Sequence, residues 1–144
     1  MTIIKQSALL PYSDQNMFDL VNDIEAYPEF MDGCVGAEVI SRTDNLVSGK
    51  LDVGKAGLKY SFSTRNHLRP PHSMEMELIE GPFKNFKACW TFTALREDAC
   101  KANLTMEFEF SSGLLDMALK ALFDASCKNL VNAVCKRAEL IYGV

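Results

Sequence analysis

The stretch that decides the fold is GLLDMALKALFDASCKNLVNAVCKRAELIY, residues 113–142. It contains no proline, and its apolar residues recur three and four positions apart, the spacing of one face of an α-helix. We predict one unbroken helix here, about 40 Å long at roughly 1.5 Å per residue. Such a helix needs a large apolar surface to lie on. Its predicted buried stripe is Leu115, Ala118, Leu119, Leu122, Phe123, Ser126, Leu130, Val134, Ala138 and Ile141.

The residues before this helix read mainly as strands. From Cys34 onward polar and apolar residues alternate with a period of two, and turn residues separate the runs. We expect about six strands joined by short turns, which predicts an antiparallel meander with one wet face and one dry face. The expected strand segments are Val35–Arg42, Leu46–Val53, Leu58–Thr64, Met74–Ile79, Phe86–Phe92 and Ala102–Phe110.

The N-terminal part predicts one strand and two short helices. Thr2–Leu9 is the strand, and Ser13 is a suitable N-cap for a helix that carries Met17 and Leu20 on one face. Pro28 breaks that helix, and Ala26–Met31 is expected to form a short second helix or turn. The expected architecture is a single α+β domain over residues 1–144, in which a curved antiparallel sheet wraps around the long C-terminal helix.

Composition excludes several classes of protein. The chain has 144 residues, 48% of them hydrophobic, and a net charge of −4 with a pI of about 5.2. We therefore expect a globular protein that does not bind DNA. No apolar run approaches the ~20 residues of a membrane span, and no signal peptide is evident. Five cysteines without a C-x-x-C pair indicate reduced thiols, so we expect a cytoplasmic protein.

The sequence offers little to catalysis or metal binding. Neither His67 nor His72 has a partner at metal-ligand spacing. The carboxylate pairs at 75/77 and 107/109 alternate with apolar residues, which places them on the solvent face of their strands. No nucleotide-binding, zinc-protease or serine-hydrolase motif is present. We expect no catalytic residue, no metal and no catalytic cofactor.

The dry face of the sheet is rich in aromatic and methionine side chains. Core packing alone explains such a face, but a curved sheet closed by a helix also tends to leave an apolar pocket, and methionine suits an adaptable one. A rival feature is a group of basic residues around one turn, which would suit an RNA contact or a solvated surface. These residues are Arg65, His67, Arg69 and His72.

Three segments point to a family. Residues 21–34, VNDIEAYPEFMDGC, resemble the V-N-D-V-x-x-Y-P-x-F-L-P-W-C signature of the coenzyme Q-binding and ribosome-association toxin family, within the START-like polyketide cyclase and lipid-transport superfamily. Residues 62–66, and residues 81–84 together with 90–92, are similar to later motifs of that family. The sequence departs from it at Asp32-Gly33, where the family has Pro-Trp.

The resemblance implies a helix-grip fold, with the long helix held by the curved sheet over a cavity. It also implies two alternative functions: binding of ubiquinone in support of respiration without catalysis, or a toxin that binds the large ribosomal subunit and blocks subunit association. A cyclase-type enzyme is a third alternative on this fold. For the ribosome alternative the predicted contact is the basic turn at Arg65, His67, Arg69 and His72.

We favour a hydrophobic small molecule, a polyprenyl quinone or similar lipid, with transient membrane contact. It would lie between the sheet and the terminal helix, with Tyr27 and Phe30 at the entrance and Tyr60 hydrogen-bonded to a quinone oxygen. The predicted ligand contacts are Tyr27, Phe30, Tyr60, Phe62, Met74, Met76, Trp90, Phe92, Met106, Phe108, Leu115, Leu119, Leu122 and Phe123.

Overall fold

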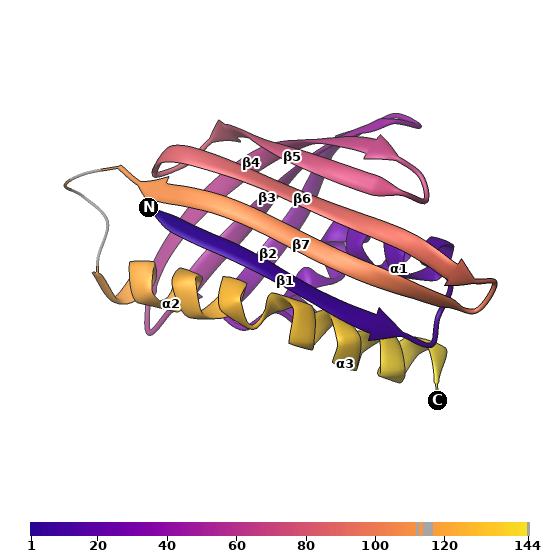
Figure 1. Cartoon of the computed structure of the whole chain (residues 1–144). Coiled ribbons are helices and arrows are strands. Elements are labelled where there is room, and N and C mark those ends of the chain that lie inside the picture. The colour runs from indigo at the N-terminus through magenta and orange to yellow at the C-terminus, as the bar shows by residue number, and fades with distance from the viewer. Residues whose placement is uncertain (112, 114–116, 144) are drawn as a thin grey trace.

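An antiparallel sheet curves around the C-terminal helices (Figure 1). The computed structural model describes residues 1–111, 113 and 117–143, and within them the sheet has seven strands in the order β1-β7-β6-β5-β4-β3-β2. Every neighbouring pair is antiparallel, as the short turns predict. The strands are β1 Thr2–Leu10, β2 Cys34–Arg42, β3 Leu46–Lys55, β4 Leu58–Arg69, β5 Ser73–Glu80, β6 Phe83–Arg96 and β7 Ala99–Phe110.

Two short helices carry the chain from one edge of the sheet to the other. After β1 the chain forms α1 (Asp14–Asn22) and the 3₁₀ helix η1 (Ile24–Glu29), and then enters β2 at the opposite edge. The predicted N-cap is confirmed, because the Asn16 N–H donates a 3.1 Å hydrogen bond to Ser13 Oγ. The meander from β2 to β7 returns to β1, so the first and last strands pair along their whole length.

The sheet bends through irregularities in its ladders. Register shifts interrupt the β2–β3, β4–β5 and β6–β7 pairings. An extra residue in one strand increases local twist and bend, so these shifts help the sheet to wrap around its inner face.

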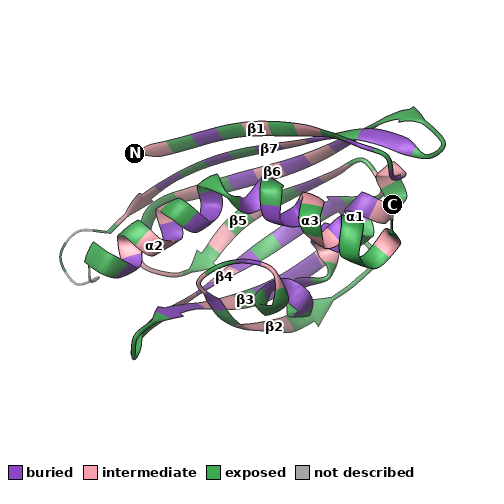
Figure 2. Cartoon of the chain, turned by 90° about the horizontal axis from the view of Figure 1, so that it is seen from below, coloured by how far each residue is buried: buried purple, intermediate pink, exposed green. Residues whose placement is uncertain are grey.

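The core lies between the inner face of the sheet and the helices. Met74, Trp90, Leu104 and Phe108 on the central strands are at most 1% exposed, whereas the intervening Glu107 is exposed. The predicted alternation is thus confirmed. The helices α2 (Met117–Lys128) and α3 (Leu130–Tyr142) lie across the open side of the sheet and alternate between buried and exposed residues (Figure 2).

The prediction of one unbroken C-terminal helix is wrong. The helix is interrupted at Asn129, where φ is −98° and ψ is −1°. Asparagine competes for backbone hydrogen bonds and is a poor residue for a helix interior. Helical hydrogen bonds still run from Asn129 N to Ala125 O (3.1 Å) and from Ala133 N to Asn129 O (3.0 Å), so the break is local. Residues 114–116, at the start of the predicted helix, lie outside the described residues.

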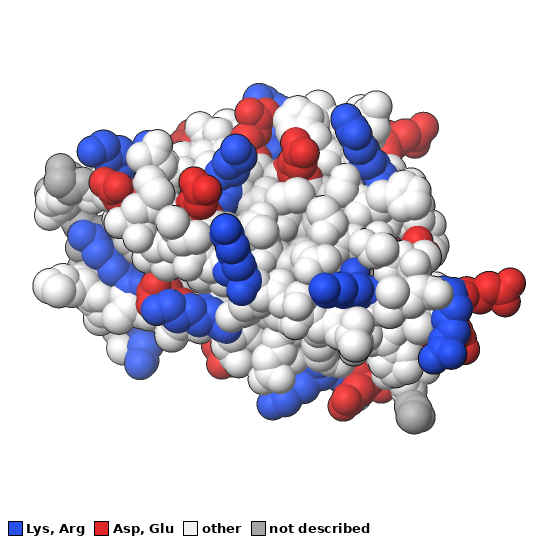
Figure 3. All heavy atoms as spheres, viewed as in Figure 1, with Lys and Arg blue, Asp and Glu red and all other residues white. Residues whose placement is uncertain are grey.

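The surface carries no block of one charge on the face shown in Figure 3, where Lys and Arg are mixed with Asp and Glu. None of the helices in the described part of the chain is long and apolar enough to cross a membrane.

Candidate functional site

An interior cavity of about 50 Å³ lies between the sheet and the helices. Side chains from η1, from strands β3 to β7 and from both C-terminal helices line it. These residues are Tyr27, Met31, Leu51, Phe62, Thr64, Met76, Phe86, Trp90, Met106, Phe123, Cys127 and Leu130. A smaller void of about 30 Å³ shares several of these walls and adds Ile24, Gly49 and Asn66.

The cavity is apolar but holds unpaired hydrogen-bond donors. Trp90 is 1% exposed, and its Nε1 has no hydrogen-bond partner. The hydroxyl of Tyr60 is also buried without a partner. Tyr60 itself lies behind the cavity wall, with its ring centroid 6.4 Å from that of Phe123. An unpaired buried polar group costs about 1–3 kcal/mol, so a ligand that supplies an acceptor would recover part of that cost.

A polar pair interrupts the inner face of β4. Thr64 Oγ1 donates a 2.8 Å hydrogen bond to Asn66 Oδ1, and both residues are buried. Thr64 borders both voids and Asn66 borders the smaller one. This side of the cavity therefore presents oxygen and amide groups among apolar neighbours.

The cavity is small in this structure. Ligand sites usually measure about 300–1,000 Å³, far more than the 50 Å³ found here. Three methionines stand in its wall, and their unbranched side chains can change rotamer at low cost. They are Met31, Met76 and Met106. A ligand of ordinary size would enter only with movement of such side chains and of the elements that cover the cavity.

The ionisable groups of the cavity are held neutral by burial. Burial raises the pKa of the Tyr27 hydroxyl and of the Cys127 thiol well above their usual values. The Tyr27 hydroxyl donates a 2.7 Å hydrogen bond to Val21 O, which fixes the ring. Burial likewise raises the pKa of Tyr60. The lining residues include no carboxylate and no imidazole, so they offer no conventional acid–base pair.

The predicted ligand contacts divide into three groups. Those that line the cavity are Tyr27, Phe62, Met76, Trp90, Met106 and Phe123. Those that belong to the surrounding core or helix faces are Phe30, Tyr60, Met74, Phe92, Phe108, Leu119 and Leu122. Leu115 lies outside the described residues.

Several lining residues escaped prediction. Thr64 is not among the predicted contacts, although it follows Phe62 by two positions and so shares its face of the strand. The alternation of β4 could therefore have identified Thr64 as an inward-facing residue. Met31, Leu51, Cys127 and Leu130 meet at the cavity only through the packing of η1, β3 and the two helices, which no local pattern reveals.

The predicted basic contact lies on the outer face of β4 and the turn that follows. Arg65, His67, Arg69 and His72 are all exposed, as predicted for His67. Glu77 approaches two of them, with Oε1 at 2.8 Å from His67 Nε2 and 3.2 Å from Arg65 Nη1. The positive charge of this patch is thus partly offset by a neighbouring carboxylate.

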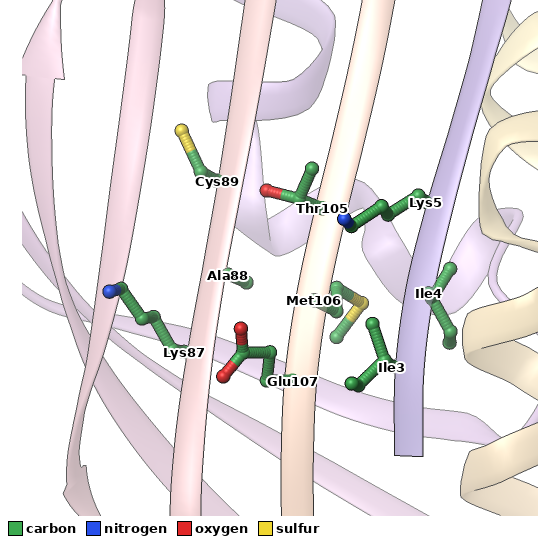
Figure 4. Close-up of a pocket in the computed structure, with 9 residues that line it drawn as sticks. All are labelled: Ile3, Ile4, Lys5, Lys87, Ala88, Cys89, Thr105, Met106 and Glu107. Atoms are coloured by element: carbon green, nitrogen blue, oxygen red, sulfur yellow. The ribbon is translucent and has the colours of Figure 1, made fainter.

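Shallow hollows also occur outside the cavity. One of about 270 Å³ lies on the outer face of β1, β7 and β6, where Lys5, Lys87 and Glu107 surround Cys89 and Thr105 (Figure 4). Its charges are mixed, and its floor is the sheet itself.

Another surface hollow, of about 300 Å³, lies between η1 and α3, and we call it the η1–α3 groove. Its residues are Glu29, Phe30, Asp32, Asn129, Ala133, Lys136, Arg137 and Leu140. Among the described residues, no group of three or more His, Cys, Asp or Glu side chains could hold a metal ion.

Comparison with known proteins identifies the family. Residues 10–135 match the model of the polyketide cyclase / dehydrase and lipid transport family. This chain belongs to that family. The curved sheet, the helices across it and the cavity between them are the architecture expected from the predicted resemblance, which is confirmed.

The chain is similar to proteins named as ribosome association toxins and to a protein named as a coenzyme Q-binding protein. The chain is 43% identical over 140 residues to the ribosome association toxin RatA of Vibrio cholerae, covering 97% of both chains. It is 28% identical to the mitochondrial coenzyme Q-binding protein COQ10 homolog B of Xenopus laevis, covering 96% of this chain and 58% of that protein. Neither name indicates catalysis.

The fold is shared with a solved aromatase/cyclase. The crystal structure of the Zhui aromatase/cyclase from a Streptomyces species superposes with a TM-score of 0.80, at 16% identity, covering 96% of this chain and 93% of that one. At this identity the likeness concerns the fold alone.

Proposed function

We propose that this protein binds an apolar ligand that carries carbonyl oxygens, a polyprenyl quinone such as ubiquinone, and supports respiratory electron transport without catalysis. The quinone is a bound ligand and not a catalytic cofactor. The observation that carries the proposal is the unpaired Nε1 of Trp90, a group that can only donate, in the wall of a mainly apolar cavity.

The chemistry of the cavity favours a quinone over a plain hydrocarbon. Burial of apolar ligand surface would contribute roughly 25 cal/mol per Å². A quinone carbonyl would also accept from Trp90 Nε1, and a second carbonyl or ether oxygen would lie beside the Thr64–Asn66 pair. The Tyr60 hydroxyl would come within reach only when side chains of the cavity wall move. A hydrocarbon would leave the indole N–H unpaired. The relative named as a coenzyme Q-binding protein supports the same ligand class.

Two experiments test this proposal. The first is lipid extraction and native mass spectrometry of protein from its own type of host, for which we expect a co-purifying quinone. The second is titration of a short-chain ubiquinone in mild detergent against wild type, Trp90→Phe and Tyr60→Phe. A net hydrogen bond of about 0.5–1.5 kcal/mol predicts a roughly 2- to 12-fold weaker Kd for Trp90→Phe. Thr105→Ala, on the outer face, is the control. Equal affinity in all four proteins would contradict the proposal.

A second candidate function is association with the large ribosomal subunit. It is favoured by the name of the relative that is 43% identical over 97% of both chains. The proposed contact remains the exposed patch of Arg65, His67, Arg69 and His72. Since this patch would meet phosphates, binding should weaken as salt rises.

The ribosome candidate is tested by sedimentation with purified large subunits at low and high salt. Arg69→Gln should reduce co-sedimentation, while Lys101→Gln on β7, which removes one charge elsewhere on the surface, should not. Failure of the wild-type protein to co-sediment at any salt concentration would refute this candidate.

A further inference from the structure

The interior cavity and the η1–α3 groove are lined by the same two segments, residues 27–32 and the stretch around Asn129. Different residues of each segment line the two hollows. Tyr27 lines the cavity while Phe30 lines the groove, although their ring centroids are only 5.1 Å apart. In the helices, Leu130 lines the cavity and the preceding Asn129, at the helix break, lines the groove. The groove and the cavity are therefore adjacent.

The guanidinium of Arg137 is a largely buried positive charge in this groove. Its side chain is only 15% exposed, and its Cζ lies 5.7 Å from the centroid of the Phe30 ring. Its Nε is buried without a hydrogen-bond partner. The contact of its Nη2 with Glu29 Oε1 is 3.5 Å long, and the Glu29 side chain is 63% exposed. A guanidinium has five N–H donors. In Arg137, the only acceptor found among the described residues is the Glu29 carboxylate.

The exposed side of α3 combines charge with apolar side chains. Leu140 follows Lys136 by four positions and Ile141 follows Arg137 by four, so each pair lies on one side of the helix. Leu140 is 76% exposed and Ile141 is 48% exposed. Cations beside exposed aliphatic side chains complement an anionic phospholipid surface, where phosphate lies next to hydrocarbon.

We propose that the η1–α3 groove binds the phosphate head group of an anionic phospholipid, with Arg137 and Lys136 as its cations, and so docks the protein on a membrane. The head group displaces Glu29 from Arg137 and takes the unpaired donors. Glu29 and Asp32 also line the groove and oppose an anion, so binding depends on the contacts with Arg137 and Lys136. This proposal rests on the proposed function in one respect: membrane docking would serve to transfer a quinone from the bilayer to the cavity.

Vesicle flotation provides the test. Wild-type protein should float with vesicles of phosphatidylcholine containing about a third phosphatidylglycerol and should not float with pure phosphatidylcholine. Arg137→Gln and Lys136→Gln should weaken binding at least fivefold. Lys101→Gln, which makes the same change in net charge on the outer face of β7, should bind as wild type. Lys136 is exposed, so its variant retains the fold even where Arg137→Gln does not.

Three results would overturn the proposal. Equal losses for Lys101→Gln and Lys136→Gln would mean that only net charge matters. Full competition by millimolar inorganic phosphate would assign the groove to a free anion instead of a membrane. Equal binding of wild type to both kinds of vesicle would exclude head-group recognition. The vesicles contain no quinone, and the quinone titration uses no anionic lipid, so failure of one proposal is distinguishable from failure of the other.

Discussion

Gly33 lies directly against Leu122, because a methyl group added at Gly33 would stand 2.9 Å from Leu122 Cγ. Gly33 precedes β2 at the edge of the sheet, and Leu122 is in the middle of α2. Gly33 also has a φ of +80°, which favours glycine. The family signature has tryptophan at this position, which is a point of close approach between the sheet and α2. The absence of a side chain at Gly33 allows Leu122 and α2 to pack there.

Gly33→Ala is predicted to destabilise the fold. Positive φ costs an L-residue roughly 1 kcal/mol, and displacement of Leu122 adds about 1 kcal/mol more. The matched control is Gly57→Ala, because Gly57 has a φ of +84° but no atom within 4 Å of the added methyl group. Urea unfolding should give a loss about twice as large for Gly33→Ala. Equal losses would mean that the Leu122 contact has no energetic weight.

The sequence predicted the faces of the strands better than the course of the last helix. The period of two placed Trp90 inside and His67 outside, and both placements are confirmed. The break at Asn129 was not predicted, because the apolar spacing continues across it. Thr64 was predictable from its phase with Phe62. The Arg137 groove was not, since it depends on where η1 meets α3.

Ser126→Ala is predicted to loosen the attachment of α2 to the segment before β2. Ser126 Oγ donates a 2.5 Å hydrogen bond to Asp32 O, and Ser126 is 4% exposed. Loss of this hydrogen bond should lower the free energy of unfolding by about 1 kcal/mol. Ser7→Ala, at an exposed position on β1, should change it by less than about 0.5 kcal/mol. Indistinguishable unfolding curves for the two variants would contradict this role.

Thiol reactivity should follow burial. Burial raises the pKa of Cys127 well above its usual value and that of Cys34 and Cys100 to about 11, so little thiolate is present at pH 8. Cys89 and Cys135 are only half-buried, and burial raises their pKa values too. Timed iodoacetamide labelling followed by peptide mass spectrometry should modify Cys89 and Cys135 first. Early modification of Cys127 would show that the cavity opens readily without ligand.

The Glu77 carboxylate should titrate below its usual range. The hydrogen bond with His67 lowers the pKa of Glu77 from its usual value of 4.5, and the hydrogen bond with Arg65 makes the second-largest contribution. A lowered folded-state pKa means that the interaction stabilises the protein above the unfolded-state pKa and is lost as pH falls through the folded-state pKa. An NMR titration should show the pKa of Glu77 rising in His67→Ala. No change at Glu77 would mean that the contact does not persist in solution.

Trp90 allows the central claim to be tested without a label, because it is the only tryptophan in the chain and lies in the cavity wall. A short-chain ubiquinone should be titrated into the protein while tryptophan fluorescence is recorded, since a quinone quenches an indole that it contacts. We predict deep, saturable quenching that ends at one quinone per protein, and no saturable quenching by a polyprenyl alcohol of similar length. Quenching that rises in proportion to quinone without saturating would mean that the cavity does not take this ligand.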